Sequence, residues 1–358
     1  MTTQPRSRPT IHDVAALAGV SKSLVSLAMR DSPKVASESR TAIIAAAAKL
    51  GYRPNAAARS LADRHSRTVG VLATDLHNPI FAQILDGVQE QLRSVDYATM
   101  LVSGGTDPAL EIRDLDKLLE FQVEGLILIS HRLPPAKIRA LAAELPTVVV
   151  SRRDVVAPCL DTVSNDDLVG ARLAVQHLVS LGHRRITHLD GGDNPVSAER
   201  CRGYLEAMTS AGLAQHVTVE PGGLTDAAGH AAAHRALAGA QPPSALFVAN
   251  DFAALGAIAA VQERGLTVPG DVSVIGYDGM ALGALHTLNL TTVAQPLTKM
   301  GALAAQRLFE RIGKPGRRAR HLRLDARLVI RGSTGPAPGW RTLQSPSTPS
   351  WSTDQTHQ

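Results

Sequence analysis

The sequence predicts a small all-α module at the N-terminus, followed by an α/β body of two doubly wound lobes built on parallel sheets. Short segments with apolar residues at helical spacing fill residues 10–52. From residue 68 onward, short β-rich runs alternate with helical segments in two separate series. A chain of 358 residues with 44% hydrophobic content is long enough for such a module and two lobes.

The segment TIHDVAALAGVSKSLVSLAM, residues 10–29, is predicted to form two short helices joined by a turn. Gly19 suits the positive φ that ends a helix, and Ser21 can cap a second helix that begins at Lys22. A turn of about three to four residues is typical of a helix-turn-helix, whose second helix enters the major groove of DNA. An ordinary pair of core helices is the alternative interpretation.

Positive charge is concentrated in this part of the chain. Residues 1–65 contain ten Lys or Arg and four Asp or Glu, a net charge of +6, whereas the whole chain carries +5. The rest of the chain therefore sums to −1. Since local positive charge neutralises DNA phosphates, double-stranded DNA is the expected partner of the module.

A third helix is expected to begin near Ser37, which can cap it, and to end at Gly51. Its predicted apolar face consists of Ile43, Ile44, Ala47 and Leu50. Three helices close a small core, which gives a DNA-binding domain of residues 1–52. Residues 53–66 are alanine-rich and too short for a stable isolated helix, so this linking segment is expected to fold only against a partner.

The body is predicted to span residues 67–332 and to place its ligand site where strands end. Ligands of doubly wound sheets bind at the carboxyl ends of the strands. Carboxylates, amides and an arginine around such a cleft can bind sugar hydroxyls, although each could instead be a surface group or a helix cap, as is credible for Asn250-Asp251. The candidate effector residues are Asp75, Asn78, Phe81, Ser130, Arg200, Asn250, Asp251, Asp278 and Gln295.

An enzymatic function is not supported by the motifs. The chain lacks GxSxG, the P-loop, GxGxxG after a strand, and HExxH, so no catalytic residue and no cofactor are assigned. His230 and His234 lie four residues apart and could face one metal ion, but no acid or cysteine close in sequence completes a set, so no metal site is expected. Cys159 and Cys201 are interpreted as small hydrophobes.

The sequence also lacks an apolar stretch of about 18 residues, the length of a membrane-spanning helix. No membrane association is expected, and the predicted location is the cytoplasm, in association with the nucleoid.

Three stretches resemble the LacI/GalR family of bacterial transcriptional regulators: TIHDVAALAGVSKSLVSLAM, VASESRTAIIAAAAKLGYRPNAAARSLA and VGVLATDLHNPIFAQILDGV. The resemblance extends from about Thr10 to about Arg331. It implies a periplasmic-binding-protein-like body, with an N-lobe of about 67–164 and 293–323 and a C-lobe of about 165–292 and 324–332. It also implies effector roles for Arg200, the pair Asn250-Asp251, and Asp278.

The resemblance places Lys22 and Ser23 at base-reading positions, and it places Leu27 where many members carry arginine. Lys22 can donate to guanine, Ser23 to nearly any base, and Leu27 can touch only a thymine methyl group. Phosphate or backbone contacts are expected from Thr10, Ser21, Ser26, Asn55 and Arg59. By resemblance, residues 53–66 form a hinge helix and linker, which adds Ala58 and Leu61 to the expected DNA-binding residues. Leu61 matches a minor-groove wedge, or alternatively anchors the hinge to the body.

The expected function is therefore a sequence-specific transcriptional regulator, a repressor by resemblance, whose affinity for a pseudo-palindromic operator depends on a small-molecule effector. A sugar is the leading class, although Leu224 and Leu297 stand where some sugar-binding members have aromatics. An effector-free architectural DNA binder and a sugar-processing enzyme with a DNA-binding appendage are the alternatives. Residues 333–358 are rich in Ser, Thr and Pro, lack a leucine heptad and are expected to be disordered, which favours a homodimer.

Overall fold

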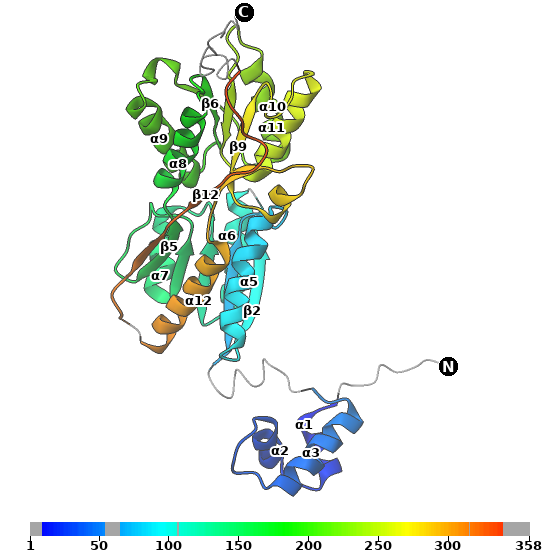
Figure 1. Cartoon of the computed structure of the whole chain (residues 1–358). Helices are drawn as coiled ribbons and strands as arrows, with labels where there is room; N and C mark the ends of the chain where they lie inside the picture. The colour runs from blue at the N-terminus through cyan, green and yellow to red at the C-terminus, as the bar shows by residue number, and fades with distance from the viewer. Residues whose placement is uncertain (1–8, 54–64, 106, 315, 339–358) are drawn as a thin grey trace, which may run out of the picture. The chain divides into compact units, whose positions relative to one another are not determined.

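The computed structural model describes residues 9–53, 65–105, 107–314 and 316–338. The chain divides into two units, residues 1–67 and residues 68–358, and each unit is described by itself (Figure 1).

The first unit contains three helices, α1 (Ile11–Ala18), α2 (Lys22–Met29) and α3 (Ser37–Leu50). Val14, Val25 and Ile43, one from each helix, meet in its core. Gly19 has φ 67° and ends α1 in the left-handed conformation, which is accessible to glycine without a Cβ clash. The axes of α1 and α2 differ in direction by 105°, as in a helix-turn-helix.

Two details of the third helix differ from the prediction. Ser37 is the first residue of α3 and Ala36 occupies the capping position, because the extended backbone ends one residue earlier than expected. Ile44 is 53% exposed, and Ala46 is buried in its place beside Ile43 and Ala47. The buried face of α3 therefore includes Ala46 in place of Ile44, so it carries smaller side chains than the sequence pattern indicated.

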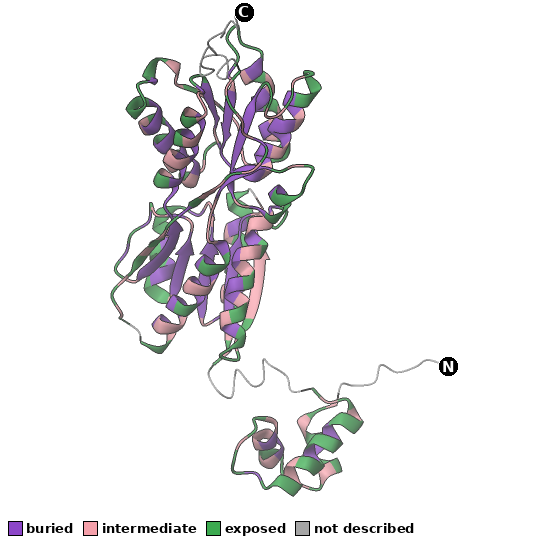
Figure 2. Ribbon diagram, viewed as in Figure 1, coloured by how far each residue is buried: buried purple, intermediate pink, exposed green. Residues whose placement is uncertain are grey.

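The N-lobe is a parallel sheet in the order β11-β5-β4-β3-β1-β2. Its strands are β1 (Thr68–Ala73), β2 (Ala98–Ser103), β3 (Gly125–Ile129), β4 (Thr147–Val150), β5 (Leu160–Asn165) and β11 (His321–Leu324). Helices α5 (Pro79–Arg93) and α12 (Leu297–Gly313) cover one face, and α6 (Pro108–Glu120) and α7 (Pro135–Glu144) cover the other. Strands β1, β3, β4 and β5 are almost wholly buried (Figure 2).

The C-lobe sheet has the order β12-β10-β9-β8-β6-β7. Its strands are β6 (Ile186–Leu189), β7 (Thr218–Glu220), β8 (Ala245–Val248), β9 (Ser273–Asp278), β10 (Thr291–Ala294) and β12 (Arg327–Val329). Helices α8 (Asp167–Ser180) and α9 (Pro195–Ser210) pack on one face, and α10 (Asp226–Leu237) and α11 (Asp251–Glu263) pack on the other. Two short 3-10 helices, η1 (Ala214–His216) and η2 (Ala281–Ala284), lie in connections.

The C-lobe sheet is parallel except for β12, which pairs antiparallel with β10. The prediction of a parallel sheet is corrected at this edge. The reason is the chain path: β10 runs toward the N-lobe and continues into α12, whereas β12 arrives from β11 of the N-lobe and runs the opposite way.

Three connections join the lobes, between β5 and α8, between β10 and α12, and between β11 and β12 (Figure 1). They fall at residues 165–167, 294–297 and 324–327, where the resemblance gave crossings near 164, 293 and 323. The predicted fold class, a helical module followed by two parallel-sheet α/β lobes, is confirmed.

The expectation of a disordered tail from residue 333 is corrected for residues 333–338, which pack on the C-lobe. Ser333 is 2% exposed, and its hydroxyl donates to the Val274 carbonyl and accepts from the Thr291 amide. The Ala337 amide donates to the Leu181 carbonyl. Because these groups extend the packing of the C-lobe, residues 333–338 belong to it, and residues 339–358 lie outside the described part of the chain.

Within the described ranges, no single helix is long and apolar enough to cross a membrane. The helices α1 and α2 pass such a test of length and composition only when taken together, across their 105° bend.

Candidate functional site

Helix α2 presents its polar side to solvent. Lys22 and Ser23 are exposed at its start, whereas Val25 and Ala28 are buried in the module core. Ser26 is half-buried, and Leu27 packs partly against the same core. The first turn of the helix is therefore free to approach base edges, as the second helix of a helix-turn-helix does.

Thr10 and Ser21 have local roles at the starts of helices. The amide and hydroxyl of Thr10 donate to Asp13 Oδ2 at 2.7 and 2.8 Å, which lowers the pKa of the Asp13 carboxyl group. Ser21 Oγ accepts from the Leu24 amide at 3.2 Å, as the sequence predicted for a capping residue. Their contacts with phosphates stay a prediction, and Asn55, Ala58, Arg59 and Leu61 lie outside the described residues.

A cavity of about 290 Å³ lies between the two lobes of the second unit. Residues of the N-lobe, of the C-lobe and of the connection that precedes α12 line this cavity. All the predicted effector residues except Asp251 line it: Asp75, Asn78, Phe81, Ser130, Arg200, Asn250, Asp278 and Gln295. The carboxyl ends of the strands thus bring together residues that are more than 200 positions apart in sequence, as expected for ligand sites of parallel sheets.

Arg200 is fixed in the wall of this cavity. It is 4% exposed, its Nε donates to Asp167 Oδ1 at 2.9 Å, and its Nη1 donates to the Ala249 carbonyl at 2.5 Å. Its guanidinium carbon lies 3.8 Å from the centre of the Tyr277 ring. Burial alone would lower the pKa of Arg200, but the carboxylates of Asp167 and Asp278 raise it above its ordinary value, so the group stays charged.

Asp278 faces Arg200 and has one unsatisfied oxygen. Its Oδ1 accepts from Gln295 Nε2 at 2.6 Å and lies 3.4 Å from Arg200 Nη2. Its Oδ2 is buried without a hydrogen-bond partner among the described residues. Burial raises the pKa of Asp278 to about 6, although Arg200 and Gln295 favour its charged form. A buried acceptor beside a cavity is a group that a ligand hydroxyl or amine can satisfy.

Asn250 and Asn78 each line the cavity and cap a helix. Asn250 Oδ1 accepts from the Ala253 amide at 2.8 Å, and its Nδ2 donates to the Leu224 carbonyl at 3.0 Å. Asn78 Oδ1 accepts from the Ile80 amide at 3.2 Å. The capping interpretation of Asn250 is therefore correct, and it does not remove the residue from the cavity wall.

Asp251 does not line the cavity, and the prediction for this residue is corrected. Its carboxylate accepts from the amides of Gly279 and Met280 at 2.9 and 2.7 Å and from the Thr292 hydroxyl at 2.6 Å. As the first residue of α11, it points back toward β9 and β10. Asp251 thus anchors the loop that follows Asp278, and burial raises its pKa to about 7.

Several lining residues were not predicted. They follow strands as the predicted ones do: Thr74, Arg132, Gly191, Gly192, Asp193, Asn194, Gly222, Gly223 and Thr225. The glycines of GGDN and PGGLT were the available signal, since a Cβ on Gly191 would lie 2.0 Å from Ser197 Oγ. Arg132 adds a second cation, from the N-lobe, to the cavity wall.

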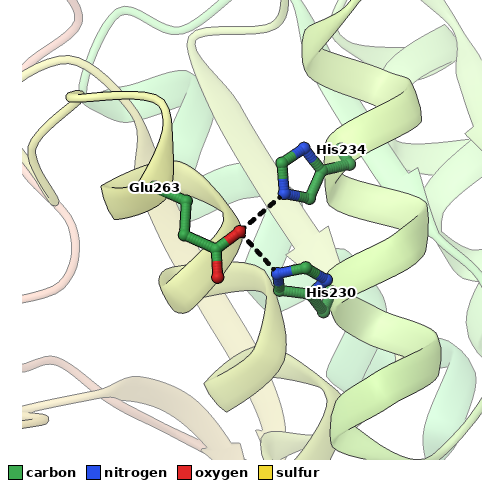
Figure 3. A group of neighbouring side chains, drawn as sticks. All are labelled: His230, His234 and Glu263. Atoms are coloured by element: carbon green, nitrogen blue, oxygen red, sulfur yellow. Dashed lines mark hydrogen bonds and ion pairs between the residues drawn. The ribbon is translucent and has the colours of Figure 1, made fainter.

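A separate group lies on α10 and α11. Nε2 of His230 and Nε2 of His234 are each 2.9 Å from Glu263 Oε2 (Figure 3). The expectation of no metal site rested on the lack of an acid close in sequence, whereas the packing of the helices brings Glu263, 29 residues from His234, beside both histidines.

A helix-turn-helix module followed by a two-lobed α/β body, with a cavity at the strand ends that holds charged and amide side chains, defines a ligand-responsive DNA-binding protein. Residues 10–55 match the model of bacterial regulatory proteins of the lacI family, and residues 175–334 match a periplasmic binding protein-like domain. The HTH-type transcriptional repressor PurR of Pectobacterium carotovorum subsp. carotovorum is 33% identical, covering 92% of this chain and 98% of that protein. The chain belongs to the LacI family of bacterial transcriptional regulators.

Two solved structures extend the similarity to the fold. The lac repressor dimer bound to operator and the anti-inducer ONPF is 28% identical with a TM-score of 0.81, covering 92% of this chain and all of that chain. A complex of the transcriptional regulator CelR with cellobiose is 32% identical with a TM-score of 0.68, covering 91% and 100%. The protein is a DNA-binding repressor with an effector domain and not an enzyme, as the sequence predicted.

Proposed function

We propose that this protein binds a pseudo-palindromic operator as a homodimer, and that a sugar or sugar derivative in the cavity between its lobes controls operator affinity. The observation that carries the proposal is the unpaired Asp278 Oδ2 in a cavity wall that also holds Arg200. A buried carboxylate next to a fixed guanidinium offers an acceptor and a donor at one place. Sugar hydroxyls are both donors and acceptors, so they suit this pair.

The size and the lining of the cavity narrow the effector further. About 290 Å³ is at the lower end of the range for small-molecule pockets, which favours a ligand of monosaccharide size. Among the apolar lining residues Phe81 is the aromatic one, beside aliphatic side chains such as Leu224 and Leu297, so aromatic stacking has a small part in binding. The similar CelR structure holds cellobiose, which supports a sugar as the ligand class.

The proposed control mechanism uses the two lobes. A ligand that contacts residues from both lobes favours the lobe arrangement in which all of these contacts form. To change an operator from mostly occupied to mostly free, the ligand must discriminate between two states by about 5 kcal/mol. We propose that the favoured state separates the hinge segments of the dimer and withdraws Leu61 from the minor groove, which lowers DNA affinity.

The effector-free architectural DNA binder is the competing function. A buried carboxylate oxygen without a hydrogen-bond partner, such as Asp278 Oδ2, lowers the stability of the protein unless a ligand supplies a donor. A protein that binds no effector gains nothing from this cost. The cavity wall therefore favours a ligand-controlled regulator.

The test is a screen of monosaccharides and their phosphates for release of a DNA fragment from upstream of the protein's own coding region, measured by fluorescence anisotropy. We expect at least one sugar to weaken DNA binding tenfold or more. If the protein binds the fragment and no compound in the screen alters that binding, the architectural alternative is favoured. If the protein does not bind the fragment, an operator is selected from a random DNA library and the screen is repeated with it.

A further inference from the structure

The cluster of His230, His234 and Glu263 lies on the surface of the C-lobe. His230 and His234 are four residues apart on α10, so both rings stand on one side of that helix. Glu263 is the last residue of α11 and reaches across to them (Figure 3). Both Nε2 atoms are 2.9 Å from the same carboxylate oxygen, and all three atoms lie within 4.8 Å of one another.

The backbones that carry these side chains are held in close contact. A Cβ on Gly229 would lie 2.0 Å from the Ala253 carbonyl oxygen, and a Cβ on Gly256 would lie 1.9 Å from the Asp226 carbonyl oxygen. Two glycines, one on each helix, therefore let α10 and α11 approach directly beside His230. The distance between the two helices at the cluster is consequently set by backbone packing.

A second contact fixes the far end of the cluster. Arg264 follows Glu263, and its guanidinium donates to the carbonyls of His234 and Leu237 at 2.9 and 3.3 Å. The residues on either side of the cluster thus bind α10 to α11. Groups held in this way around a ligand set lose little freedom when the ligand arrives.

We propose that His230, His234 and Glu263 form a binding site for a divalent transition metal ion, Zn²⁺ in preference to Mg²⁺. Two imidazole nitrogens and one carboxylate oxygen are a known zinc ligand set that leaves a fourth position for water. Zinc holds such atoms at about 2.0–2.2 Å, so tetrahedral ligand atoms are about 3.3 Å apart. Small side-chain rotations bring the three atoms to that spacing. Mg²⁺ prefers oxygen ligands in octahedral geometry and does not suit this set.

The exposure of the cluster suits entry of an ion. The side chains of His230 and His234 are each 35% exposed, and that of Glu263 is 55% exposed. A carboxylate only accepts hydrogen bonds, so both imidazoles donate from Nε2 to Glu263 in the metal-free cluster. When the ion binds, each neutral ring carries its proton on Nδ1 and turns the Nε2 lone pair to the metal.

The test uses the untagged full-length chain, stripped with EDTA, dialysed and titrated with Zn²⁺ by isothermal calorimetry. The matched variants are His234→Gln and Glu263→Gln, with His286→Gln as a control at an exposed histidine elsewhere in the C-lobe. We expect one high-affinity Zn²⁺ per chain, at least tenfold weaker binding in the two cluster variants, and unchanged binding in the control. Mg²⁺ should give no binding at the same concentrations.

Two further readouts keep the test independent of folding. The variants should unfold at the wild-type temperature in EDTA, and Zn²⁺ should raise that temperature only for the wild type and the control. Co²⁺ should give the intense visible absorption of tetrahedral coordination in the same two proteins. Equal Zn²⁺ affinity of the wild type and both cluster variants, or no stoichiometric binding by the wild type, would overturn the proposal.

Discussion

Arg200 and Asp278 lie side by side in the wall of the cavity, with Arg200 Nη2 3.4 Å from Asp278 Oδ1. The other nitrogens of Arg200 bind Asp167 and the Ala249 carbonyl, so the guanidinium is oriented without any ligand. Asp278 Oδ2 is left without a partner among the described residues. The pair thus combines a rigid donor with an unsatisfied acceptor, which is an arrangement prepared for a polar molecule.

Replacing Arg200 should destabilise the body. Arg200→Ala leaves the buried carboxylates of Asp167 and Asp278 without their cation, and removing one partner of such a group lowers the free energy of unfolding by about 3–5 kcal/mol. Urea unfolding measures the loss. Arg202→Ala is the matched control on the same helix, because its exposed pair with Glu199 contributes less than about 1 kcal/mol. Equal losses in the two variants would contradict the buried cluster as a source of stability.

The contribution of Asp251 to stability should fall as the pH rises from about 4 to about 7. Burial raises the pKa of Asp251 from 3.8 to about 7, so the folded state holds a proton that the unfolded state has lost in this range. The contribution of Asp251 to stability is complete below its unfolded pKa and disappears as pH passes the folded value.

Asp251→Asn isolates this effect. An amide can accept from the Gly279 and Met280 amides and donate to the Thr292 hydroxyl, which reproduces the bonds of the protonated acid. The free energies of unfolding of both proteins are measured in urea at several pH values, and between pH 4 and 7 the wild type should lose stability relative to the variant. Parallel pH profiles would show that Asp251 does not titrate as described.

Lys22→Ala should weaken operator binding by about 1–3 kcal/mol, because Lys22 is exposed at the start of α2, where base contacts are made. The measurement is fluorescence anisotropy with a selected operator at one salt concentration. Lys49→Ala, an exposed lysine in the last turn of α3, serves as the control and should have a smaller effect. A larger effect at Lys49 would shift the interface from α2 to α3.

Gly229→Ala should destabilise the C-lobe by about 1–3 kcal/mol or more, because its Cβ would overlap the Ala253 carbonyl. A Cβ on Gly239 would meet only the Ala236 carbonyl oxygen, at an ordinary contact distance of 4.0 Å, and its φ is one that other residues adopt, so Gly239→Ala should be tolerated. Thermal unfolding of the two variants makes the comparison. Similar unfolding temperatures would show that α10 and α11 separate without cost.

The helices of the module and eight residues of the cavity wall could be predicted, because each depends on a local pattern. Gly19 and Ser21 mark the turn of the helix-turn-helix by their conformational preferences. Asp278 and Gln295 were found because polar residues at the carboxyl ends of parallel strands converge at one edge of a sheet.

The parts that could not be predicted depend on side-chain direction and on helix packing. Asn250 and Asp251 are adjacent, yet Asn250 lies in the cavity wall and Asp251 points back to the sheet. The exact residue at which α11 starts determines this difference. Glu263 is 29 residues from His234 in sequence. It joins the histidines only because Gly229 and Gly256 let two helices touch.

The most direct test of the central claim is the coupling between effector and operator in Asp278→Asn. For the wild type, the releasing sugar should weaken operator binding by some factor, and the operator should weaken sugar binding by the same factor, because coupling between two sites is reciprocal. Calorimetry and anisotropy measure the two factors. The variant should bind the operator as the wild type does but show little coupling at the same sugar concentration. Full wild-type coupling in Asp278→Asn would contradict an effector site built on Asp278 and Arg200.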